Sequence, residues 1–440
     1  MLKLVVLSIC VLLNVVNSIR VFDFEVDGGA KANDDSWNTV WANGRALNAT
    51  LAKLSRGDRL VIPSDKTFYL MGGIVAHRLY DVTIQIDGTL KFSSTLLDDV
   101  DKKYIDQWPR DENGDVLECI RLKDVEKVKI TGSGSGVLDG AGQKWWGVPG
   151  VGYLVREENR PRLLHIERGS HVLIENIFLK DSPYWTFLAE YVKHLEIRYS
   201  KIDARRTSSS SHDILDLTAF NTDGFDMSHC DDVYIHDCSV INQDDCFDVK
   251  DGTSNVVIER VNASGLGLTI GSISSHVNNI TFRDSRMDKT YKGIYIKFRG
   301  EGRISNVLYE NIVINEPSQW AVWIGPAQQC DGCSFTKLCS ANPCSLCWPT
   351  DPFAKCNAVK RGKFENIILR NITINNPKKS SGVLIADADT PMKNLIFENV
   401  VVNNPKTTPF KNYYVENAPG IALGTTNPIP PGFVDLTSKK

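Results

Sequence analysis

A short pattern of apolar and polar positions recurs from the middle of the chain to near its end. Each copy has two apolar residues that flank one variable residue and are followed by a charged residue or histidine. The copies are short, alternating and rich in β-branched residues, which indicates strands and not helices. Most copies follow one another at a similar interval, which lies in the range typical of solenoid repeats. The eight copies begin at Val172, Leu195, Val233, Val256, Ile280, Val307, Ile367 and Leu395.

Two larger gaps interrupt this period, one between Leu195 and Val233 and one between Val307 and Ile367. The first gap contains a serine-rich stretch at 208–211, and the second contains a cluster of cysteines. We interpret both gaps as insertions or extra coils in an otherwise regular repeat.

Asparagine directly precedes five of the eight copies. Its backbone tolerates the left-handed conformation, and its amide can hydrogen-bond to an equivalent asparagine one repeat away. The pattern therefore predicts an all-β fold, a single-stranded parallel β-helix whose coils stack about 4.8 Å apart. Leucine-rich repeats would need leucine at several fixed positions, and propeller blades would need a longer period. The five asparagines are Asn255, Asn279, Asn306, Asn366 and Asn394.

Residues 35–55 show a different pattern, with apolar side chains near helical spacing. We interpret this segment as a short N-terminal helix that caps the solenoid, because an open end would expose a row of unpaired backbone groups. The apolar positions are Trp37, Val40, Trp41, Leu47 and Leu51.

The segment 1–18 has the three parts of a signal peptide. Met1-Leu2-Lys3 supplies a cationic start, an apolar run follows at 4–16, and the small residues Val16 and Ser18 occupy the cleavage positions. A buried N-terminal strand is the less favoured alternative. No later segment approaches the roughly 18 continuous apolar residues of a membrane span, so we expect a secreted, extracellular protein with no membrane attachment. Residues 19–440 would then form one catalytic domain.

Cysteine usage agrees with export. Removal of the signal peptide would leave ten cysteines, six of them between Cys330 and Cys356. Exported thiols are usually oxidised, so we predict a cysteine-rich insertion around 330–356 that is held by disulfides, with a zinc site as the less favoured alternative. Asn-x-Ser/Thr triplets, which support export if they lie on the surface, begin at Asn48, Asn262, Asn279 and Asn371.

The charge balance limits the possible partners. The formal net charge is −3, from 50 Lys and Arg against 53 Asp and Glu. Nucleic-acid binding would need a basic field that this composition does not provide. We therefore expect no nucleic-acid partner, and we expect the protein to be a monomer.

Two acidic clusters carry the candidate chemistry, Asn221-Thr-Asp223-Gly and Gln243-Asp244-Asp245. The interval between Asp223 and Asp244 is close to one repeat, so coil stacking would make them neighbours. Crowded carboxylates disfavour each other's ionisation, and acid/base chemistry is the usual reason to tolerate that cost. Adjacent side chains of a regular strand point to opposite faces, so we expect the backbone to bend at Asp244-Asp245 or one of the two to point inward.

Seven motifs follow one another along the chain: Gly140–Gly147 (GAGQKWWG), Arg160-Pro161, Ser182–Trp185 (SPYW), the two acidic clusters, Gly265–Ser272 (GLGLTIGS) and Gly293–Lys297 (GIYIK). Together they resemble the polygalacturonase-like glycoside hydrolases, glycoside hydrolase family 28, over nearly the whole mature chain. The resemblance implies a right-handed parallel β-helix that hydrolyses α-linked galacturonan, a pectic polysaccharide, with inversion at the anomeric carbon. Carboxylates and water suffice for this chemistry, so no metal or other cofactor is expected.

The resemblance also assigns residue roles. Asp244 would protonate the glycosidic oxygen, while Asp223 and Asp245 would orient and deprotonate the attacking water. An inverting site separates its acid and base by about 6.5–9.5 Å, and we expect that separation here. The substrate-binding candidates are Asn221, Gln243, Tyr295, Lys297 and Arg299.

Two positions depart from the family pattern. Where the family usually has histidine, this chain has Leu266, which cannot share a proton or tune a neighbouring pKa. Where the family usually has arginine, this chain has Tyr295, which cannot grip a carboxylate as a guanidinium does. Lys297 remains, and Arg299 or Lys292 could compensate from nearby.

These observations leave three functions open. The first is an active hydrolase whose pectic substrate differs from plain polygalacturonate. The second is a catalytically weak relative that binds pectin as a lectin-like or decoy protein, because losing a group that assists proton transfer can cost about 10²- to 10⁴-fold. The third, a structural surface protein, leaves the acidic cluster unexplained. A pectin lyase is not favoured, because the Gln-Asp-Asp triplet argues against β-elimination.

Cys230 and Cys246 flank the predicted catalytic repeat. A disulfide between them would make the site rigid, and we expect one. We also expect Trp320 and Trp323 to be packed against neighbouring residues and not to stack on a sugar.

Overall fold

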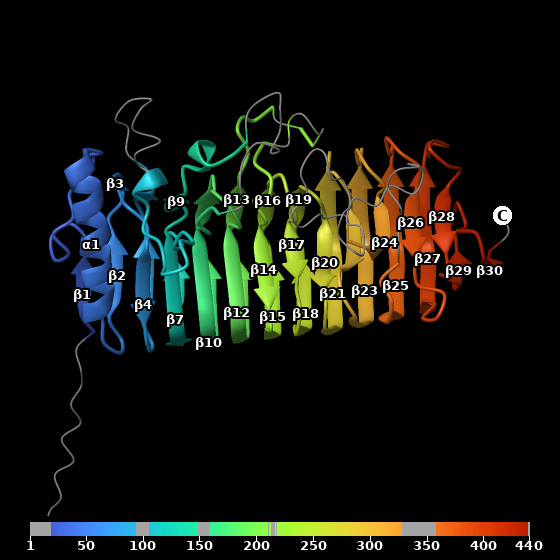
Figure 1. Ribbon diagram of the computed structural model, residues 1–440, viewed down its shortest axis with the longest axis horizontal. Helices are drawn as coiled ribbons and strands as arrows, with labels where there is room; N and C mark the ends of the chain where they lie inside the picture. Colours follow the sequence, from blue (N-terminus) through green and yellow to red (C-terminus); the bar gives the residue numbers. More distant parts are fainter. Residues whose placement is uncertain are drawn as a thin grey trace, which may run out of the picture.

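The computed structural model describes residues 19–93, 105–147, 159–209, 211–212, 216, 218–327 and 358–438. Parallel strands lie side by side along one elongated body, from helix α1 (Trp37–Lys53) at one end to β30 (Phe433–Thr437) at the other (Figure 1). The fold is a parallel β-helix, as predicted. The predicted signal peptide at 1–18 and the cysteine-rich insertion around 330–356 lie outside the described residues.

Pairing between coils sorts the strands into three rows, and the longest strands run through a corner into the next row. The first row contains β4 (Ile74–His77), β7 (Ile120–Glu126), β10 (Leu164–Glu175), β12 (Phe187–Arg198), β14 (Phe225–Ser228), β17 (Phe247–Val249), β20 (Leu268–Ile273), β22 (Ile294–Phe298), β24 (Val322–Pro326), β26 (Gly382–Ile385) and β28 (Tyr413–Glu416).

The second row continues through the C-terminal parts of β10 and β12. Its other members are β1 (Val21–Asp23), β2 (Arg59–Ile62), β5 (Thr83–Ile86), β8 (Lys129–Thr131), β15 (Asp231–His236), β18 (Ser254–Glu259), β21 (His276–Asp288), β23 (Gly302–Asn315), β25 (Gly362–Asn375), β27 (Lys393–Asn403), β29 (Gly420–Gly424) and β30.

The third row is made of short strands and ends in the C-terminal parts of β21, β23, β25 and β27. A single 3-10 helix, η1 (Gly142–Lys144), follows β9 in the part of the chain that the structure describes. The short strands are β3 (Thr67–Tyr69), β6 (Thr89–Lys91), β9 (Val137–Asp139), β11 (Phe178–Lys180), β13 (Lys201–Asp203), β16 (Ser239–Ile241) and β19 (Asn262–Ser264).

The eight predicted strand copies stack in register in the second row. Val172 pairs with Leu195, and the same alignment continues coil by coil to Leu395. Both large gaps join directly neighbouring coils, because Leu195 pairs with Val233 and Val307 pairs with Ile367. Each gap is therefore an insertion within one coil and not an extra coil. The first residue of every copy is buried and contributes to one continuous apolar core.

The asparagines before the apolar repeat positions form a ladder, as predicted, although they lie inside the second-row strands and not ahead of them. Their φ angles of 52° to 58° are left-handed. Asn366 Nδ2 donates to Asn306 Oδ1 at 2.9 Å, and Asn394 Nδ2 donates to Asn366 Oδ1 at 3.0 Å. One rung differs from the prediction, because the Asn306 amide donates to Asn278 at 2.7 Å and not to Asn279.

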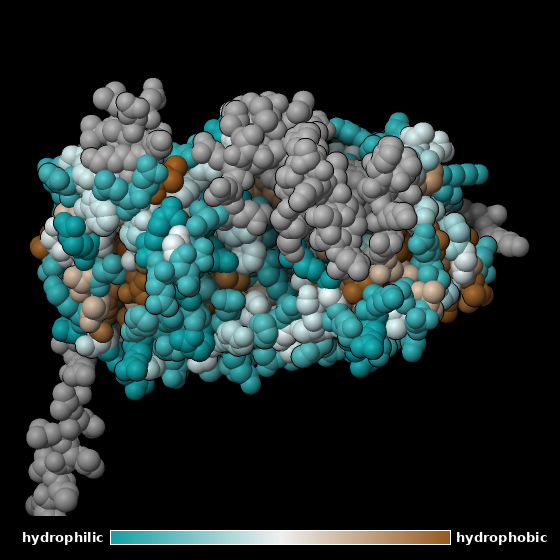
Figure 2. Space-filling model, viewed as in Figure 1, coloured by the Kyte–Doolittle hydropathy of each residue, from teal (hydrophilic) through white to brown (hydrophobic). Residues whose placement is uncertain are grey.

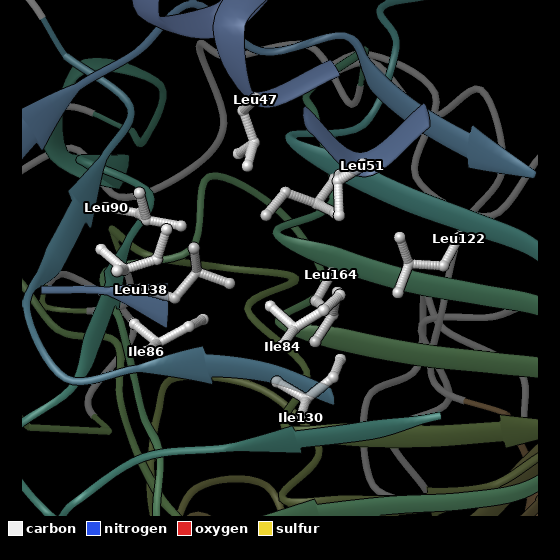
Figure 3. Close-up of a pocket in the computed structure, with 11 residues that line it drawn as sticks. Leu47, Leu51, Ile84, Ile86, Leu90, Leu122, Ile130, Leu138 and Leu164 are labelled. Atoms are coloured by element: carbon white, nitrogen blue, oxygen red, sulfur yellow. The ribbon is translucent and has the colours of Figure 1, made fainter. Parts of the chain in front are cut away.

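Helix α1 caps the N-terminal end of the solenoid, as predicted (Figure 1). Its apolar face includes the buried residues Val40, Leu47 and Leu51. Leu47 and Leu51 point into a small cavity of about 20 Å³ that is lined only by leucine and isoleucine (Figure 3). The apolar interior of the first coils is thereby covered. The other lining residues are Ile62, Ile84, Ile86, Leu90, Ile120, Leu122, Ile130, Leu138 and Leu164.

The outer surface is mostly polar. On the face shown in Figure 2, hydrophilic residues predominate and apolar residues appear in scattered groups. Among the described residues, no helix has the length and apolar character needed to cross a membrane. Of the four Asn-x-Ser/Thr asparagines, Asn262, Asn279 and Asn371 are exposed and Asn48 is half-buried.

Candidate active site

The acidic clusters lie directly before strands of the first row. Pairing of β14, β17, β20 and β22 fixes the alignment of these coils. A backbone hydrogen bond of 2.8 Å from Gly224 N to Asp245 O continues the ladder beyond the strands. The residues two positions before each strand therefore stack along one side of the solenoid: Asp223, Asp245, Leu266 and Lys292.

The chain bends between β16 and β17, which resolves the expected conflict between adjacent side chains. Asn242 holds the bend by donating its amide to the backbone oxygen of Asp245 at 2.8 Å. Gly265 in the next coil permits a close approach, since a Cβ there would lie 2.6 Å from the Asp244 backbone oxygen. Both aspartates of the triplet thus lie on the same side as Asp223.

The structure brings the three aspartates together. One carboxylate oxygen each from Asp223, Asp244 and Asp245 lies within 4.8 Å of the other two. This spacing is shorter than the separation of about 6.5–9.5 Å that we expected for an inverting site. The three residues are 4%, 3% and 1% exposed, respectively. A sugar that reacts here must therefore enter a site that holds little bulk water.

Asp244 has the surroundings of a proton donor. Its Oδ2 accepts a hydrogen bond from Asn221 N at 2.9 Å, and its Oδ1 accepts one from Asp245 N at 2.8 Å. Burial, followed by the negative charge of Asp245, raises the pKa of Asp244 to about 7. A carboxyl group that keeps its proton near neutral pH can donate it to a leaving group.

Asp245 has the opposite surroundings. Lys297 Nζ donates to its Oδ2 at 2.7 Å, and the Thr269 hydroxyl donates to its Oδ1 at 2.6 Å. An adjacent cation and a hydrogen bond both stabilise the carboxylate form. The two neighbouring aspartates therefore have different partners, since Asp244 accepts from backbone N–H groups whereas Asp245 accepts from an ammonium and a hydroxyl.

Asp223 connects this group to a second set of buried charges. Lys250 Nζ lies 3.7 Å from Asp223 Oδ2 and 3.8 Å from Asp226 Oδ2, and it also contacts Asp248. Burial, followed by the charges of Asp244 and Asp226, raises the pKa of Asp223. Among the described residues, Asp223 Oδ1 has no hydrogen-bond partner. Such an orphaned buried acceptor is a suitable place for a water molecule.

The second set of charges was not predicted, although the sequence contains a signal for it. The sequence Asp-x-Phe-Asp occurs twice, at Asp223–Asp226 and at Asp245–Asp248. Because β14 pairs with β17, Asp226 aligns with Asp248. Within the described ranges, these carboxylates are close enough to share a cation, but Lys250 and Lys297 already supply positive charge. We therefore assign no metal to this site.

Comparison with known proteins gives this geometry a family. The family model described as glycosyl hydrolases family 28 matches residues 56–418. The chain belongs to glycosyl hydrolases family 28. Its relatives include the probable exopolygalacturonase B of Neosartorya fischeri, which is 26% identical over 387 residues, or 80% of this chain and 78% of the relative. Endo-xylogalacturonan hydrolase A of Aspergillus tubingensis is 27% identical over 311 residues, or 68% and 70% of the two chains.

Solved structures of pectin-related hydrolases share the fold. The crystal structure of endo-xylogalacturonan hydrolase from Aspergillus tubingensis aligns with a TM-score of 0.66 at 22% identity, over 95% of this chain and 99% of that one. The hyperthermoactive exopolygalacturonase from Thermotoga maritima aligns with a TM-score of 0.65 at 19% identity, over 92% and 91%. Membership of the family makes the chain a polygalacturonase-like hydrolase that acts on glycosidic bonds of pectin.

Leu266 and Tyr295, which we interpreted from the sequence as departures from the usual pattern, lie in the same small apolar cluster. Leu266 and Tyr295 are 7% and 1% exposed and pack together with Trp320 and Trp323. The Trp323 indole N–H donates to the Pro326 backbone oxygen at 2.9 Å. Both tryptophans are buried in this cluster, as predicted. The remaining buried members of the cluster are Val383 and Ile385.

Two other predicted substrate-binding residues of this family 28 chain, Lys297 and Arg299, differ in how accessible they are to a substrate. Lys297 is buried between Asp245 and the ring of Tyr295, whose centre lies 4.3 Å from Nζ. Arg299 is half-buried just beyond the end of β22, and its backbone N–H donates to the Ile273 oxygen at 2.8 Å. Lys297 therefore acts within the site, whereas Arg299 lies nearer its edge.

Gln243 is buried and binds backbone groups of a neighbouring loop. Its Oε1 accepts from Ala219 N at 2.8 Å, and its Nε2 donates to the oxygens of Ser211 at 2.9 Å and Asp216 at 2.6 Å. Gln243 also lines a hollow of about 520 Å³, to which none of the three described catalytic candidates contributes. Its amide is thus committed to holding the loop beside the site.

Asn221 likewise holds the site from its edge. It adopts a left-handed φ of 57°, which directs its backbone N–H at Asp244. Its side-chain oxygen accepts a hydrogen bond from Arg160 Nη2 at 3.2 Å. Arg160, part of the family motif at 160–161, also donates to the Phe220 backbone oxygen at 2.9 Å. Arg160 is therefore a positioning residue, a role that the motif at 160–161 did not reveal by itself.

The predicted disulfide between Cys230 and Cys246 is wrong. Both thiols are free and buried, as are those of Cys119 and Cys238. Cys246 aligns with Gly224 at the start of β14, whereas Cys230 follows the end of that strand. The four residues of β14, Phe225–Ser228, lie between the two levels, and at about 3.3 Å each they alone span more than the roughly 7 Å that a disulfide can bridge between Cα atoms.

Proposed function

We propose that this family 28 hydrolase is secreted and cleaves α-glycosidic bonds of a galacturonan-type pectic polysaccharide with inversion at the anomeric carbon. The contrast between Asp244 and Asp245 carries the proposal. One is a buried acid whose pKa is raised to about 7, and the other is a carboxylate paired with Lys297. Names of relatives that refer to polygalacturonan and xylogalacturonan support the same class of substrate.

In the proposed reaction Asp244 gives its proton to the glycosidic oxygen as the bond to the anomeric carbon breaks. A water molecule attacks that carbon and passes a proton to Asp245. Asp223 accepts the other hydrogen bond from this water, because its Oδ1 is otherwise an unpaired buried acceptor among the described residues. Proton exchange with solvent then restores the protonated Asp244 and the ionised Asp245.

The predicted binding residues divide into two groups in this proposal. Lys297 pairs with Asp245, while Asn221 and Gln243 position the acid and the adjoining loop. Arg299 and Tyr295 remain the candidates to contact sugar. In this proposal no catalytic role depends on residue 295. Tyr295 can therefore stand where the family usually has arginine.

We further propose that residues 1–18 are removed as a signal peptide and that 19–440 act as one extracellular domain, a monomer without a membrane anchor. The exposed asparagines of three Asn-x-Ser/Thr triplets support export. N-terminal sequencing and the mass of the secreted protein in solution test this proposal. A mature protein that begins at Met1, or that elutes as a stable dimer, would contradict it.

A lectin-like or decoy protein is the second candidate function. It is favoured by the replacement of the family histidine by Leu266, which packs in an apolar cluster and supplies no proton. The low exposure of the three aspartates points the same way. Binding of pectin without bond cleavage is the behaviour that separates this candidate from the hydrolase.

One experiment distinguishes the two. The secreted protein and its Asp244→Asn variant are incubated with a panel of pectic polysaccharides, and new reducing ends are measured. The exposed Asp389→Asn variant is the matched control. We expect hydrolysis by the wild type and the control, and a loss of about 10²- to 10⁴-fold in Asp244→Asn. The anomer released first, read by NMR, tests inversion.

Undiminished activity of Asp244→Asn would contradict the acid assignment. Binding without new reducing ends in the wild type would favour the lectin-like candidate.

A further inference from the structure

Lys292 differs from the other buried lysines of the site in having no carboxylate partner within ion-pair distance among the described residues. Lys297 is bonded to Asp245, and Lys250 lies against Asp223, Asp226 and Asp248. Lys292 is only 2% exposed. A buried ammonium without an anion is costly, so its presence calls for a reason.

Aromatic rings surround this ammonium. Nζ of Lys292 lies 4.5 Å from the ring centres of both Tyr291 and Tyr295, and 5.9 Å from that of Trp323. Ring faces attract a cation, but they compensate only part of what it loses on leaving water. Burial, followed by the nearby charge of Lys297, lowers the pKa of Lys292 to about 7. The environment therefore disfavours the ammonium form of Lys292, and an incoming anion would stabilise that form.

The position of Lys292 relates it to the reacting groups. It occupies the same stacked position as Asp223, Asp245 and Leu266, one coil beyond Leu266 and two beyond Asp245. Two coils correspond to about 10 Å along the solenoid axis. An anion bound at Lys292 would thus belong to a part of the substrate chain next to the bond that is cleaved.

We propose that Lys292 binds the carboxylate of a galacturonate unit beside the cleaved bond, and that the cage of Tyr291, Tyr295 and Trp323 strengthens this contact by excluding water. The inference rests on the proposed function, because it assigns a specificity residue to that site. It also gives the two family departures a common purpose. Leu266 and Tyr295 build the apolar wall in which a single ammonium selects an acidic sugar over a neutral one.

The proposal requires the ammonium form of Lys292. Binding of an acidic sugar should therefore weaken as the pH rises through about 7, the value to which the pKa of Lys292 is lowered. Asp244, Asp245 and Lys297 are the other charged groups whose fields reach Lys292. Ionisation of Asp244 would weaken anion binding over the same range, so an arginine at 292, which stays charged, isolates the lysine's share.

The test measures binding by calorimetry with the full secreted protein, using tri-galacturonic acid and its fully methyl-esterified counterpart as probes. The variants are Lys292→Met, which keeps the length of the side chain without its charge, and Lys292→Arg, which keeps the charge. Lys393→Met, at an exposed lysine of β27 far along the solenoid, is the matched control.

We expect Lys292→Met to weaken binding of the acidic probe by about tenfold or more, and to leave binding of the ester within about twofold. Lys292→Arg should restore most of the affinity and reduce its pH dependence, and the control should match the wild type. Equal weakening of both probes, or no weakening of either, would overturn the proposal.

Parallel measurement of reducing ends keeps this inference separate from the proposed function. Charge-selective binding that depends on Lys292, without hydrolysis, would retain the inference and reject the hydrolase. Hydrolysis with unchanged binding in Lys292→Met would do the reverse.

Discussion

The solenoid stacks like side chains in two places, with opposite consequences. Within the second-row strands, asparagines such as Asn306, Asn366 and Asn394 form hydrogen bonds to one another from coil to coil. Before the first-row strands, Asp223 and Asp245 stack in the same manner, but a carboxylate can only accept. The same repeat thus has two outcomes. Stacked amides form a stabilising ladder, whereas stacked carboxylates need protons or cations.

The comparison teaches where the chemistry comes from. Each of the three clustered aspartates is satisfied differently: Asp245 by Lys297, Asp223 in part by Lys250, and Asp244 by retaining a proton. Unequal compensation of neighbouring carboxyl groups creates an acid beside a base. Removing the compensation should therefore cost more than removing a rung of the ladder.

Lys297→Met should give the largest change in stability. It leaves Asp245 buried without a cation, which should lower the free energy of unfolding by about 3–5 kcal/mol at neutral pH. Denaturant-induced unfolding measures the change. Lys292→Met is the control, because Lys292 has no carboxylate partner within the described ranges, and we expect no comparable loss. Similar losses in both variants would show that the ion pair with Asp245 does not make Lys297 contribute more to stability than Lys292.

The pH dependence of stability should show the repulsion among the three clustered aspartates. The pKa of Asp244 is raised in the folded protein from its ordinary value of 3.8 to about 7. The folded state therefore binds more protons than the unfolded state in that interval. The stability contributed by this group is fully present below pH 3.8 and is lost as the pH rises through about 7.

Unfolding by denaturant at about pH 5 and about pH 7.5 tests this effect. Between these conditions the free energy of unfolding should fall less for Asp244→Asn than for the wild type, by on the order of 1 kcal/mol or more. Carboxyls whose pKa is lowered, such as Glu259, are ionised in both states across this window and add no slope. Identical slopes in the two proteins would remove the evidence for a protonated Asp244.

Substitutions in the asparagine ladder should give the smallest loss of stability, and they should not change the rate of pectin hydrolysis. Asn366→Ala removes the bonds to Asn306 and Asn394 and places alanine at a left-handed φ of 56°. We expect a loss of roughly 2 kcal/mol in the free energy of unfolding. Asn366→Gly, which accepts that φ, should lose less. A change in the rate of pectin hydrolysis in either variant would mean that the two stacks are not independent.

Periodicity predicted the fold well because every coil repeats the same physical task. The alternation at Val233 and Val256 reflects a side chain that must enter the core, and the asparagine before Val256 reflects a turn with positive φ. Such local requirements appear directly in the sequence. The lengths of the two insertions were equally visible, although their location within single coils needed the pairing of Val307 with Ile367.

The site was less predictable because it depends on phase within a coil and not on period. Cys230 and Cys246 are separated by less than one repeat, so their levels on the coil could not be read from spacing alone. Asp226 and Asp248 were overlooked because each is unremarkable until β14 and β17 pair. The bend at Asp244-Asp245, which sets the short carboxylate spacing, likewise depends on Asn242 and on contacts between coils.

In the proposed reaction Asp244 is the acid and Asp245 the base. Hydrolysis of polygalacturonate can be compared with hydrolysis of an aryl galacturonide whose leaving group needs no protonation. We expect Asp244→Asn to lose at least about tenfold less activity on the activated substrate than on polygalacturonate, and Asp245→Asn to lose activity on both alike. Equal losses of Asp244→Asn on the two substrates would contradict these roles.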